Sequence, residues 1–183
     1  MRHLVTGGAR SGKSTYALEQ ALQLAPSGPI GFIATATPMD GDMADRIRRH
    51  QAERDERFLT LEAPLDIAGA LLDPRPRAFI VDCLTLWCSN LLFAGSTGHF
   101  LDTKPDAELF GRHVDALEQA VAACDRPVIL VTNEVGLGIV PPDAVTRTYR
   151  DWLGRLNQRV ARASDRVTLL VSGIPVVIKP GTR

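Results

Sequence analysis

The chain of 183 residues carries 21 basic and 21 acidic side chains, so its formal net charge is zero. This balance provides no field that would attract nucleic acid or anionic lipid, and 5% aromatic residues do not resemble a base-stacking protein. No apolar run approaches the roughly 18 residues of a membrane span, and the first residues enter a strand pattern without a signal peptide. The odd cysteine count, at Cys83, Cys88 and Cys124, favours neither disulfides nor a zinc site. We therefore expect one cytoplasmic domain, residues 1–183, that does not act on nucleic acid.

Short apolar runs alternate with segments of helical periodicity along the chain. The expected strands are residues 3–6, 30–35, 78–82, 127–132 and 167–172, and the expected helices are 13–25, 41–57, 64–72, 83–93, 106–124 and 143–163. Strands that are apolar throughout are typical of a parallel sheet buried on both faces, and their alternation with helices predicts an α/β doubly wound fold. Residues 173–179 follow a glycine turn and are expected to add an antiparallel strand at one edge. Residues 94–106 and 133–143 are expected to form loops.

The segment GGARSGKS, residues 7–14, matches the phosphate-binding pattern G-x-x-x-x-G-K-[ST] between an expected strand and an expected helix. In such a loop the backbone N–H groups and the helix N-terminus surround phosphate oxygens. The residues that would supply this backbone are Gly7, Gly8, Ala9, Arg10, Ser11 and Gly12. Lys13 would reach the terminal phosphates, and the hydroxyl of Ser14 would bind Mg²⁺. The sequence therefore predicts a site for a nucleoside triphosphate.

Asp82 is the expected acidic partner of this loop, because it follows four apolar residues of the strand 78–82. A carboxylate at the end of a neighbouring strand commonly holds the metal or its water shell in nucleotide-binding proteins. The alternative is that Asp82 caps the N-terminus of the helix 83–93. The two roles are compatible.

His50 lies at the end of an apolar face on the expected helix 41–57. On spacing alone, a half-buried core histidine is the favoured explanation. Arg46 and Arg54 lie one turn before and after it, however, and Arg49 is adjacent. Clustered guanidinium groups would lower the pKa of the imidazole, keep it neutral, and bind phosphate oxygens. This setting suits nucleophilic attack on phosphorus, whereas a solvated arginine face remains the alternative.

Five segments together resemble the bifunctional adenosylcobinamide kinase/adenosylcobinamide-phosphate guanylyltransferase family of cobalamin biosynthesis. They are LVTGGARSGKS (4–14), IAT (33–35), MADRIRRHQAER (43–54), TNEVGLGIVP (132–141) and RLNQRVARASDRVTLLVSGIPVVIK (155–179). The phosphate loop is generic, but the histidine segment and TNEVGLGIVP are specific to this family, and the resemblance extends over almost the whole chain. It implies a RecA-like P-loop fold, with a mostly parallel sheet flanked by helices, and a homotrimer.

The resemblance also implies two reactions that depend on Mg²⁺. The protein would phosphorylate adenosylcobinamide with ATP or GTP. It would then transfer GMP from GTP to adenosylcobinamide-phosphate through a GMP–histidine intermediate, giving adenosylcobinamide-GDP and pyrophosphate. The intermediate carries over to His50, the only histidine in the matching segment. Some relatives have a second histidine where this chain has Arg49, so the assignment is less ambiguous here.

The family's nucleotide site maps onto several further positions of this chain. Besides residues 7–14 they are Ala34, Thr35, Gln51, Ala52, Glu53, Arg54, Glu62 and Asp82. Some relatives carry Glu at position 82, and the shorter Asp leaves direct or water-mediated contact with Mg²⁺ open. Glu62 also fits an exposed acid that precedes a helix.

The segment TNEVGLGIVP leaves the carboxyl end of an expected central strand, where open α/β sheets bind their ligands. Asn133 and Glu134 are therefore candidates to contact substrate or to orient a water on the metal. The alternative is a loop fixed for packing or for subunit contact.

Two other functions fit the phosphate loop. One is a small-molecule kinase in which His50 is structural, and the other is a switch or assembly ATPase without small-molecule chemistry. Only the bifunctional enzyme requires nucleotide to become covalently attached to the histidine.

Overall fold

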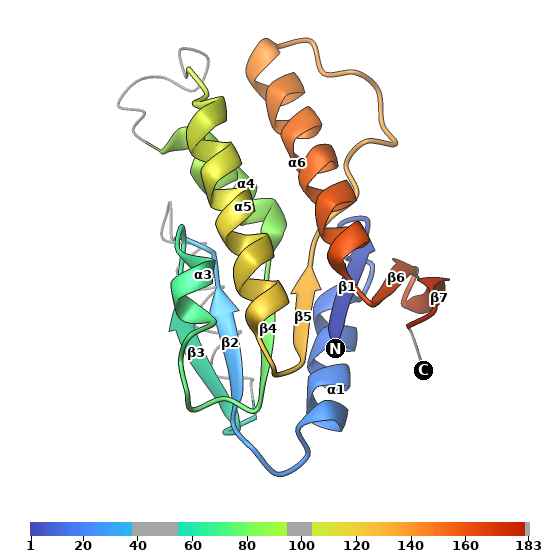
Figure 1. Ribbon diagram of the computed structural model, residues 1–183. Helices are drawn as coiled ribbons and strands as arrows, with labels where there is room; N and C mark the ends of the chain where they lie inside the picture. Colours follow the sequence, from blue (N-terminus) through green and yellow to red (C-terminus); the bar gives the residue numbers. More distant parts are fainter. Residues whose placement is uncertain (38–54, 95–103, 182–183) are drawn as a thin grey trace.

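The computed structural model describes residues 1–37, 55–94 and 104–181, whose strands form one seven-stranded sheet (Figure 1). The strands are β1 (Arg2–Gly7), β2 (Ile30–Ala34), β3 (Phe58–Glu62), β4 (Ala78–Asp82), β5 (Val128–Val131), β6 (Arg166–Val171) and β7 (Ile174–Lys179). The helices are α1 (Lys13–Leu24), α3 (Ile67–Ala70), α4 (Leu84–Phe93), α5 (Ala107–Ala123) and α6 (Ala144–Ala163). The strand order is β3-β2-β4-β5-β1-β6-β7, and all neighbours are parallel except β6 and β7.

Two hydrophobic cores cover the two faces of the sheet. Successive strand residues point to opposite faces, so Leu4 belongs to the core beneath α3, α4, α5 and α6, whereas Val5 belongs to the core beneath α1. The four central strands β1, β2, β4 and β5 are buried along most of their length. Their continuous apolar sequence is explained by this double coverage, and the predicted parallel sheet with an antiparallel C-terminal edge strand is confirmed.

β3, the edge strand next to β2, is not among the strands predicted from the sequence. Its apolar residues in FLTLE are interrupted by Thr60, and none of the five residues is fully buried, so no continuous apolar run marks the strand. The pairing from Ile30↔Phe58 to Ala34↔Glu62 shows that the buried strand β2 organises it. Tertiary pairing therefore determines this element more than its own sequence does.

Two predicted helices were wrong in extent. Residues 55–57 were expected to end a helix but form a turn, in which Phe58 N donates to the carbonyl of Asp55 at 3.0 Å. The rest of that expected helix, 41–54, lies outside the described ranges, and so does most of the expected loop 94–106. The helix expected at 64–72 is reduced to α3, which begins after Asp66 accepts a hydrogen bond from Gly69 N at 2.8 Å. The other predicted helices and the loop 133–143 are confirmed within a residue or two.

None of the helices in the described ranges is both long and apolar enough to cross a membrane.

The three cysteines, Cys83, Cys88 and Cys124, are free thiols. Burial raises the pKa of Cys88 to about 12, so this thiol stays protonated at neutral pH.

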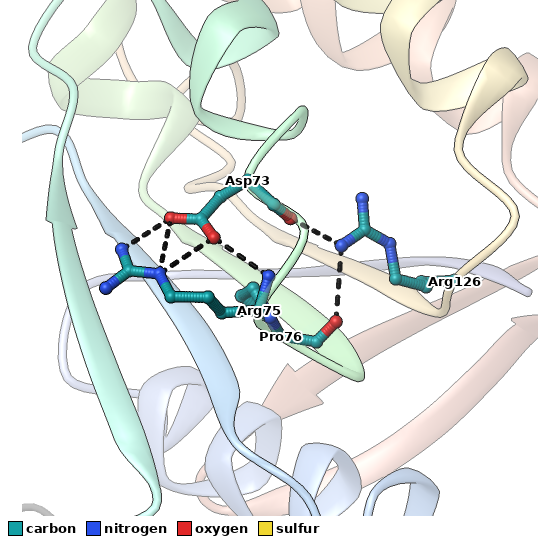
Figure 2. Close-up of polar contacts among 4 residues, drawn as sticks. All are labelled: Asp73, Arg75, Pro76 and Arg126. Atoms are coloured by element: carbon teal, nitrogen blue, oxygen red, sulfur yellow. Dashed lines mark hydrogen bonds and ion pairs between the residues drawn. The ribbon is translucent and has the colours of Figure 1, made fainter.

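The side chain of Arg126 binds the backbone of the segment between α3 and β4, at the edge of the sheet where β4 and β5 begin (Figure 2). Its guanidinium donates to the carbonyls of Leu71 at 2.9 Å, Asp73 at 2.5 Å and Pro76 at 3.2 Å, and it lies 4.6 Å from the centre of the Phe79 ring. A single side chain thus satisfies three backbone acceptors of the segment between α3 and β4.

We expect Arg126→Met to lower the free energy of unfolding by about 2 kcal/mol, because backbone carbonyls lose a charged donor. Arg75→Met is the matched control, since Arg75 is 62% exposed and only pairs with Asp73 in a surface ion pair. That control is expected to cost less than about 1 kcal/mol. Urea unfolding measures both values, and equal losses in the two variants would contradict the role of Arg126.

His3 is fully buried between the sheet and α1, and its Nε2 lies 2.8 Å from the hydroxyl of Thr168. Burial, with a smaller contribution from the charge of Arg166, lowers the pKa of His3 from 6.5 to about 4. The unfolded chain therefore binds a proton near pH 6.5 that the folded chain does not bind until about pH 4.

The contribution of neutral His3 to the free energy of unfolding is therefore fully present above pH 6.5. As the pH falls toward 4, up to about 3 kcal/mol of that free energy is lost. We expect His3→Gln to flatten the fall in unfolding free energy across this window. Urea unfolding at pH 7, 5.5 and 4.5 tests this, and parallel slopes for wild type and variant would show that His3 does not titrate in this way.

Candidate nucleotide site

The phosphate loop between β1 and α1 has the backbone that its glycines permit. Gly7 has φ of 150°, and a Cβ placed there would lie 2.5 Å from the carbonyl oxygen of Leu170 on β6. Gly12, at the N-cap of α1, has φ of 92° in the left-handed region. Both positions are therefore restricted to glycine, one by space and both by conformation. The loop turns into the N-terminus of α1, which is the arrangement that binds phosphate oxygens.

Lys13 is the first residue of α1 and its side chain is directed back into the loop. The residue is 7% exposed, and its Nζ donates to the carbonyl of Gly8 at 2.6 Å and to the hydroxyl of Ser11 at 3.4 Å. Burial lowers the pKa of Lys13, while Cys83 and Asp82 act in the opposite direction. The ammonium group thus lies inside the loop and within electrostatic reach of Asp82.

Asp82 ends β4, and the chain beyond it is held by Thr35 at the end of β2. The Thr35 hydroxyl donates to the carbonyl of Cys83 and accepts from its N–H, both at 2.8 Å, and Thr35 N donates to the carbonyl of Asp82 at 3.2 Å. The peptide bond between Asp82 and Cys83 is cis. α4 begins at Leu84, and its N-cap position is Cys83, the residue after Asp82.

Three adjacent strands present their last residues side by side at this edge. Ala34 is in register with Glu62 of β3 and with Asp82 of β4. The Asn90 amide on α4 joins the strand ends, since Nδ2 donates to the carbonyls of Thr35 at 2.8 Å and Pro64 at 2.9 Å. Glu62 is exposed and precedes α3, so its geometry fits both a ligand contact and the surface acid of the alternative reading.

The loop after β5 contacts the phosphate loop through its backbone. Glu134 N donates to the carbonyl of Gly7 at 3.2 Å, and the Glu134 carboxylate accepts from Gly136 N at 2.7 Å within its own loop. Asn133 N donates to the hydroxyl of Thr85 at 2.7 Å. Asn133 and Glu134 therefore lie beside the phosphate loop, as the position of this segment after a central strand predicts.

The turn between β6 and β7 is a further neighbour of the phosphate loop. Gly173 N donates to the carbonyl of Ser11 at 3.0 Å, and Ser172 and Gly173 both have positive φ, of 51° and 84°. This two-residue connection is typical of a tight antiparallel hairpin. The sequence marked the turn through its glycine, but it gave no signal that the turn lies against the phosphate loop.

The structure thus places Asp82, Asn133 and Glu134 near the phosphate loop 7–14. Ala34, Thr35 and Glu62 lie at the same carboxyl edge of the sheet, at the ends of β2 and β3, which β4 and β5 separate from β1. The remaining predicted site residues, His50, Gln51, Ala52, Glu53 and Arg54, lie outside the described residues. The chain leaves the described part after Thr37, two residues beyond Thr35, and returns at Asp55.

Sequence comparisons give a consistent result over the whole chain. The model of the family described as cobinamide kinase / cobinamide phosphate guanyltransferase matches residues 3–178. The bifunctional adenosylcobalamin biosynthesis protein CobP of Pseudomonas aeruginosa is 40% identical, covering 98% of each chain. The bifunctional adenosylcobalamin biosynthesis protein CobU of Salmonella typhimurium is 43% identical over 98% of this chain and 100% of the relative, and that of Escherichia coli is 41% identical over the same shares.

Solved structures resemble this one in fold alone. The flagellar accessory protein FlaH from Methanocaldococcus jannaschii aligns over 98% of this chain and 78% of its own, with a TM-score of 0.52 and 10% identity. Together with the strand order, in which the phosphate-loop strand β1 lies between β5 and β6, this likeness identifies the predicted RecA-like P-loop fold.

Proposed function

Because the chain belongs to the cobinamide kinase / cobinamide phosphate guanyltransferase family, we propose that it catalyses two successive reactions on adenosylcobinamide. The first is phosphorylation by ATP or GTP, and the second is transfer of GMP from GTP to adenosylcobinamide-phosphate. The family match over residues 3–178 carries this proposal. The phosphate loop, with Lys13 buried inside it beside Asp82, supports it physically.

In the proposed phosphorylation, the substrate hydroxyl attacks the γ-phosphorus, its proton is released, and the bond to the β–γ bridging oxygen breaks. The N–H groups of the loop 7–13 would hold the β- and γ-phosphate oxygens, and the Lys13 ammonium would exchange its contacts with Gly8 and Ser11 for phosphate oxygens. Positioning and charge stabilisation supply most of the catalysis in such transfers.

Mg²⁺ fits the same site. Ser14 is exposed in the first turn of α1, and Asp82 lies within electrostatic reach of Lys13, so a hydroxyl and a carboxylate lie beside the phosphate loop. These are the hard oxygen ligands that Mg²⁺ prefers, and Ser14 and Asp82 would hold it directly or through water. Bound there, the ion would neutralise charge on the phosphate oxygens.

In the proposed guanylyl transfer, an imidazole nitrogen of His50 attacks the α-phosphorus of GTP, and pyrophosphate leaves. An oxygen of adenosylcobinamide-phosphate then attacks the same phosphorus, the P–N bond breaks, and His50 is regenerated. We propose that Ala34, Thr35, Glu62 and residues 51–54 bind the nucleotide in this step.

The test is to supply the wild-type protein with adenosylcobinamide, Mg²⁺ and ATP, and to add GTP in a second stage. Mass spectrometry is expected to show adenosylcobinamide-phosphate first and adenosylcobinamide-GDP with pyrophosphate after GTP. A product that stops at the phosphate would reduce the protein to a small-molecule kinase. Nucleotide hydrolysis without any corrinoid product would favour a switch or assembly ATPase.

We propose further that the protein is a cytoplasmic homotrimer. Exposed apolar side chains support self-association: Ile174 is 66% and Ile178 is 59% exposed on the edge strand β7, and Ile139 is 97% exposed in the loop after β5. Light scattering is expected to give a trimer for wild type and smaller species for the double variant Ile174→Asp, Ile178→Asp. A monomeric wild type would contradict the proposal.

A further inference from the structure

Asn157 of α6 holds the segment that connects β5 with its following loop. Its Oδ1 accepts from the hydroxyl of Thr132 at 2.8 Å, and its Nδ2 donates to the carbonyl of Asn133 at 3.0 Å. Thr132 is fully buried, and its N–H donates to the carbonyl of Val5 on β1 at 3.0 Å. One amide group therefore fixes a side chain and a main-chain oxygen of consecutive residues.

The same segment is held from two other directions. The buried Thr85 on α4 accepts from Asn133 N at 2.7 Å, and Gly7 of the phosphate loop accepts from Glu134 N at 3.2 Å. Residues 132–134 are thus connected to α4, α6 and the phosphate loop at once. A displacement of the segment at the Asn157 contact would change the position of Asn133 and Glu134 relative to Gly7.

We propose that Asn157 is a positioning residue for phosphoryl transfer, an inference that rests on the proposed function. It holds residues 132–134 against the phosphate loop so that Asn133 and Glu134 keep their places beside the transferred phosphate. Only an amide fulfils both contacts. An aspartate accepts from Thr132 but places a carboxylate oxygen against the carbonyl of Asn133, and a leucine makes neither bond.

A positioning role, a nucleotide-binding role and a purely stabilising role of Asn157 affect different measured quantities. In the described part of the chain the hydrogen bonds of Asn157 go to Thr132 and Asn133 and not to the Gly7–Ser14 loop, which would bind the nucleotide, so nucleotide affinity should persist when Asn157 is changed. Because small displacements of reacting groups cost large factors in rate, kcat should fall instead. A residue that only stabilised the fold would lower the melting temperature and leave kcat of the folded enzyme unchanged.

The experiment compares Asn157→Leu, Asn157→Asp, Thr132→Val and the double variant Thr132→Val, Asn157→Leu with wild type. Gln158→Leu is the matched control, because Gln158 is the exposed neighbour on the same helix. We measure kcat and KM for phosphorylation of adenosylcobinamide, the Kd of ATP, and the melting temperature. Thr132→Val keeps the shape of the side chain and removes only the hydroxyl, so it tests the contact even if an Asn157 variant fails to fold.

We expect kcat to fall about 10-fold to 10²-fold in the Asn157 variants and in Thr132→Val, while the Kd of ATP changes less than about 3-fold. The double variant should be no worse than the poorer single variant, because both remove the same contact. Wild-type kcat in Thr132→Val, or a loss confined to ATP affinity, overturns the positioning role. A wild-type protein that does not phosphorylate adenosylcobinamide overturns the proposed function itself, which the same data set separates from the previous outcomes.

Discussion

Lys13→Met is expected to lower kcat for phosphorylation of adenosylcobinamide by about 10²-fold to 10³-fold, the loss typical of removing one preorganised charge-stabilising group. Methionine preserves the apolar stem but removes the ammonium that now contacts Gly8 and Ser11. We expect guanylyl transfer to fall as well, because in the proposed function the same loop holds the phosphates of GTP.

The loss should not come from unfolding. Lys13 is 7% exposed and burial lowers its pKa, so the folded protein bears a cost for this charge that methionine removes. We therefore expect an equal or higher melting temperature in Lys13→Met. Lys104→Met, at an exposed lysine, serves as the control and should retain both activities. Steady-state kinetics of the two variants test this prediction. A Lys13→Met enzyme with wild-type kcat would contradict a role of the Lys13 ammonium in phosphoryl transfer.

His50→Ala should separate the two reactions. Loss of the nucleophile is expected to reduce GMP transfer by more than about 10³-fold, as for nucleophiles of other covalent mechanisms. Phosphorylation by ATP should remain within a few-fold of wild type, because that step needs no protein nucleophile. Product analysis with ATP alone and with both nucleotides measures the two activities in one preparation.

His113→Ala is the control for this second prediction. His113 lies on α5 with its ring 6.4 Å from that of Trp87, away from the phosphate loop, and both activities should persist when it is removed. Equal loss of the two activities in His50→Ala would indicate a general structural role for His50. Unchanged GMP transfer would show that His50 is not the nucleophile of that step.

The sequence predicts the phosphate loop well because the loop is determined locally. Gly7 and Gly12 adopt backbone conformations that residues with a side chain rarely adopt, and the following helix begins at Lys13. The sequence motif therefore predicts the backbone geometry of the loop directly. The buried central strands are equally recognisable, since coverage on both faces makes them apolar throughout.

Other features depend on contacts between distant parts of the chain. β3 is a partly exposed edge strand that β2 organises, and no apolar run identifies it. The Thr35 hydroxyl is bonded to the backbone of Cys83, and Gly173 N is bonded to Ser11 in the phosphate loop. Asn157 is unremarkable in the sequence, and its contacts with Thr132 and Asn133 arise only when α6 packs beside β5. Each of these requires the sheet order, which the alternation of strands and helices does not specify.

The GMP–histidine intermediate is tested most directly by covalent labelling with GTP that carries radiolabel at the α-phosphate, in the presence of Mg²⁺. We predict that wild type takes up label that survives denaturation and is released in mild acid, as expected of a phosphoramidate, and that His50→Ala takes up none. A wild-type protein that hydrolyses ATP or phosphorylates adenosylcobinamide but never becomes labelled would contradict the GMP–histidine intermediate, and with it the guanylyltransferase half of the proposed function.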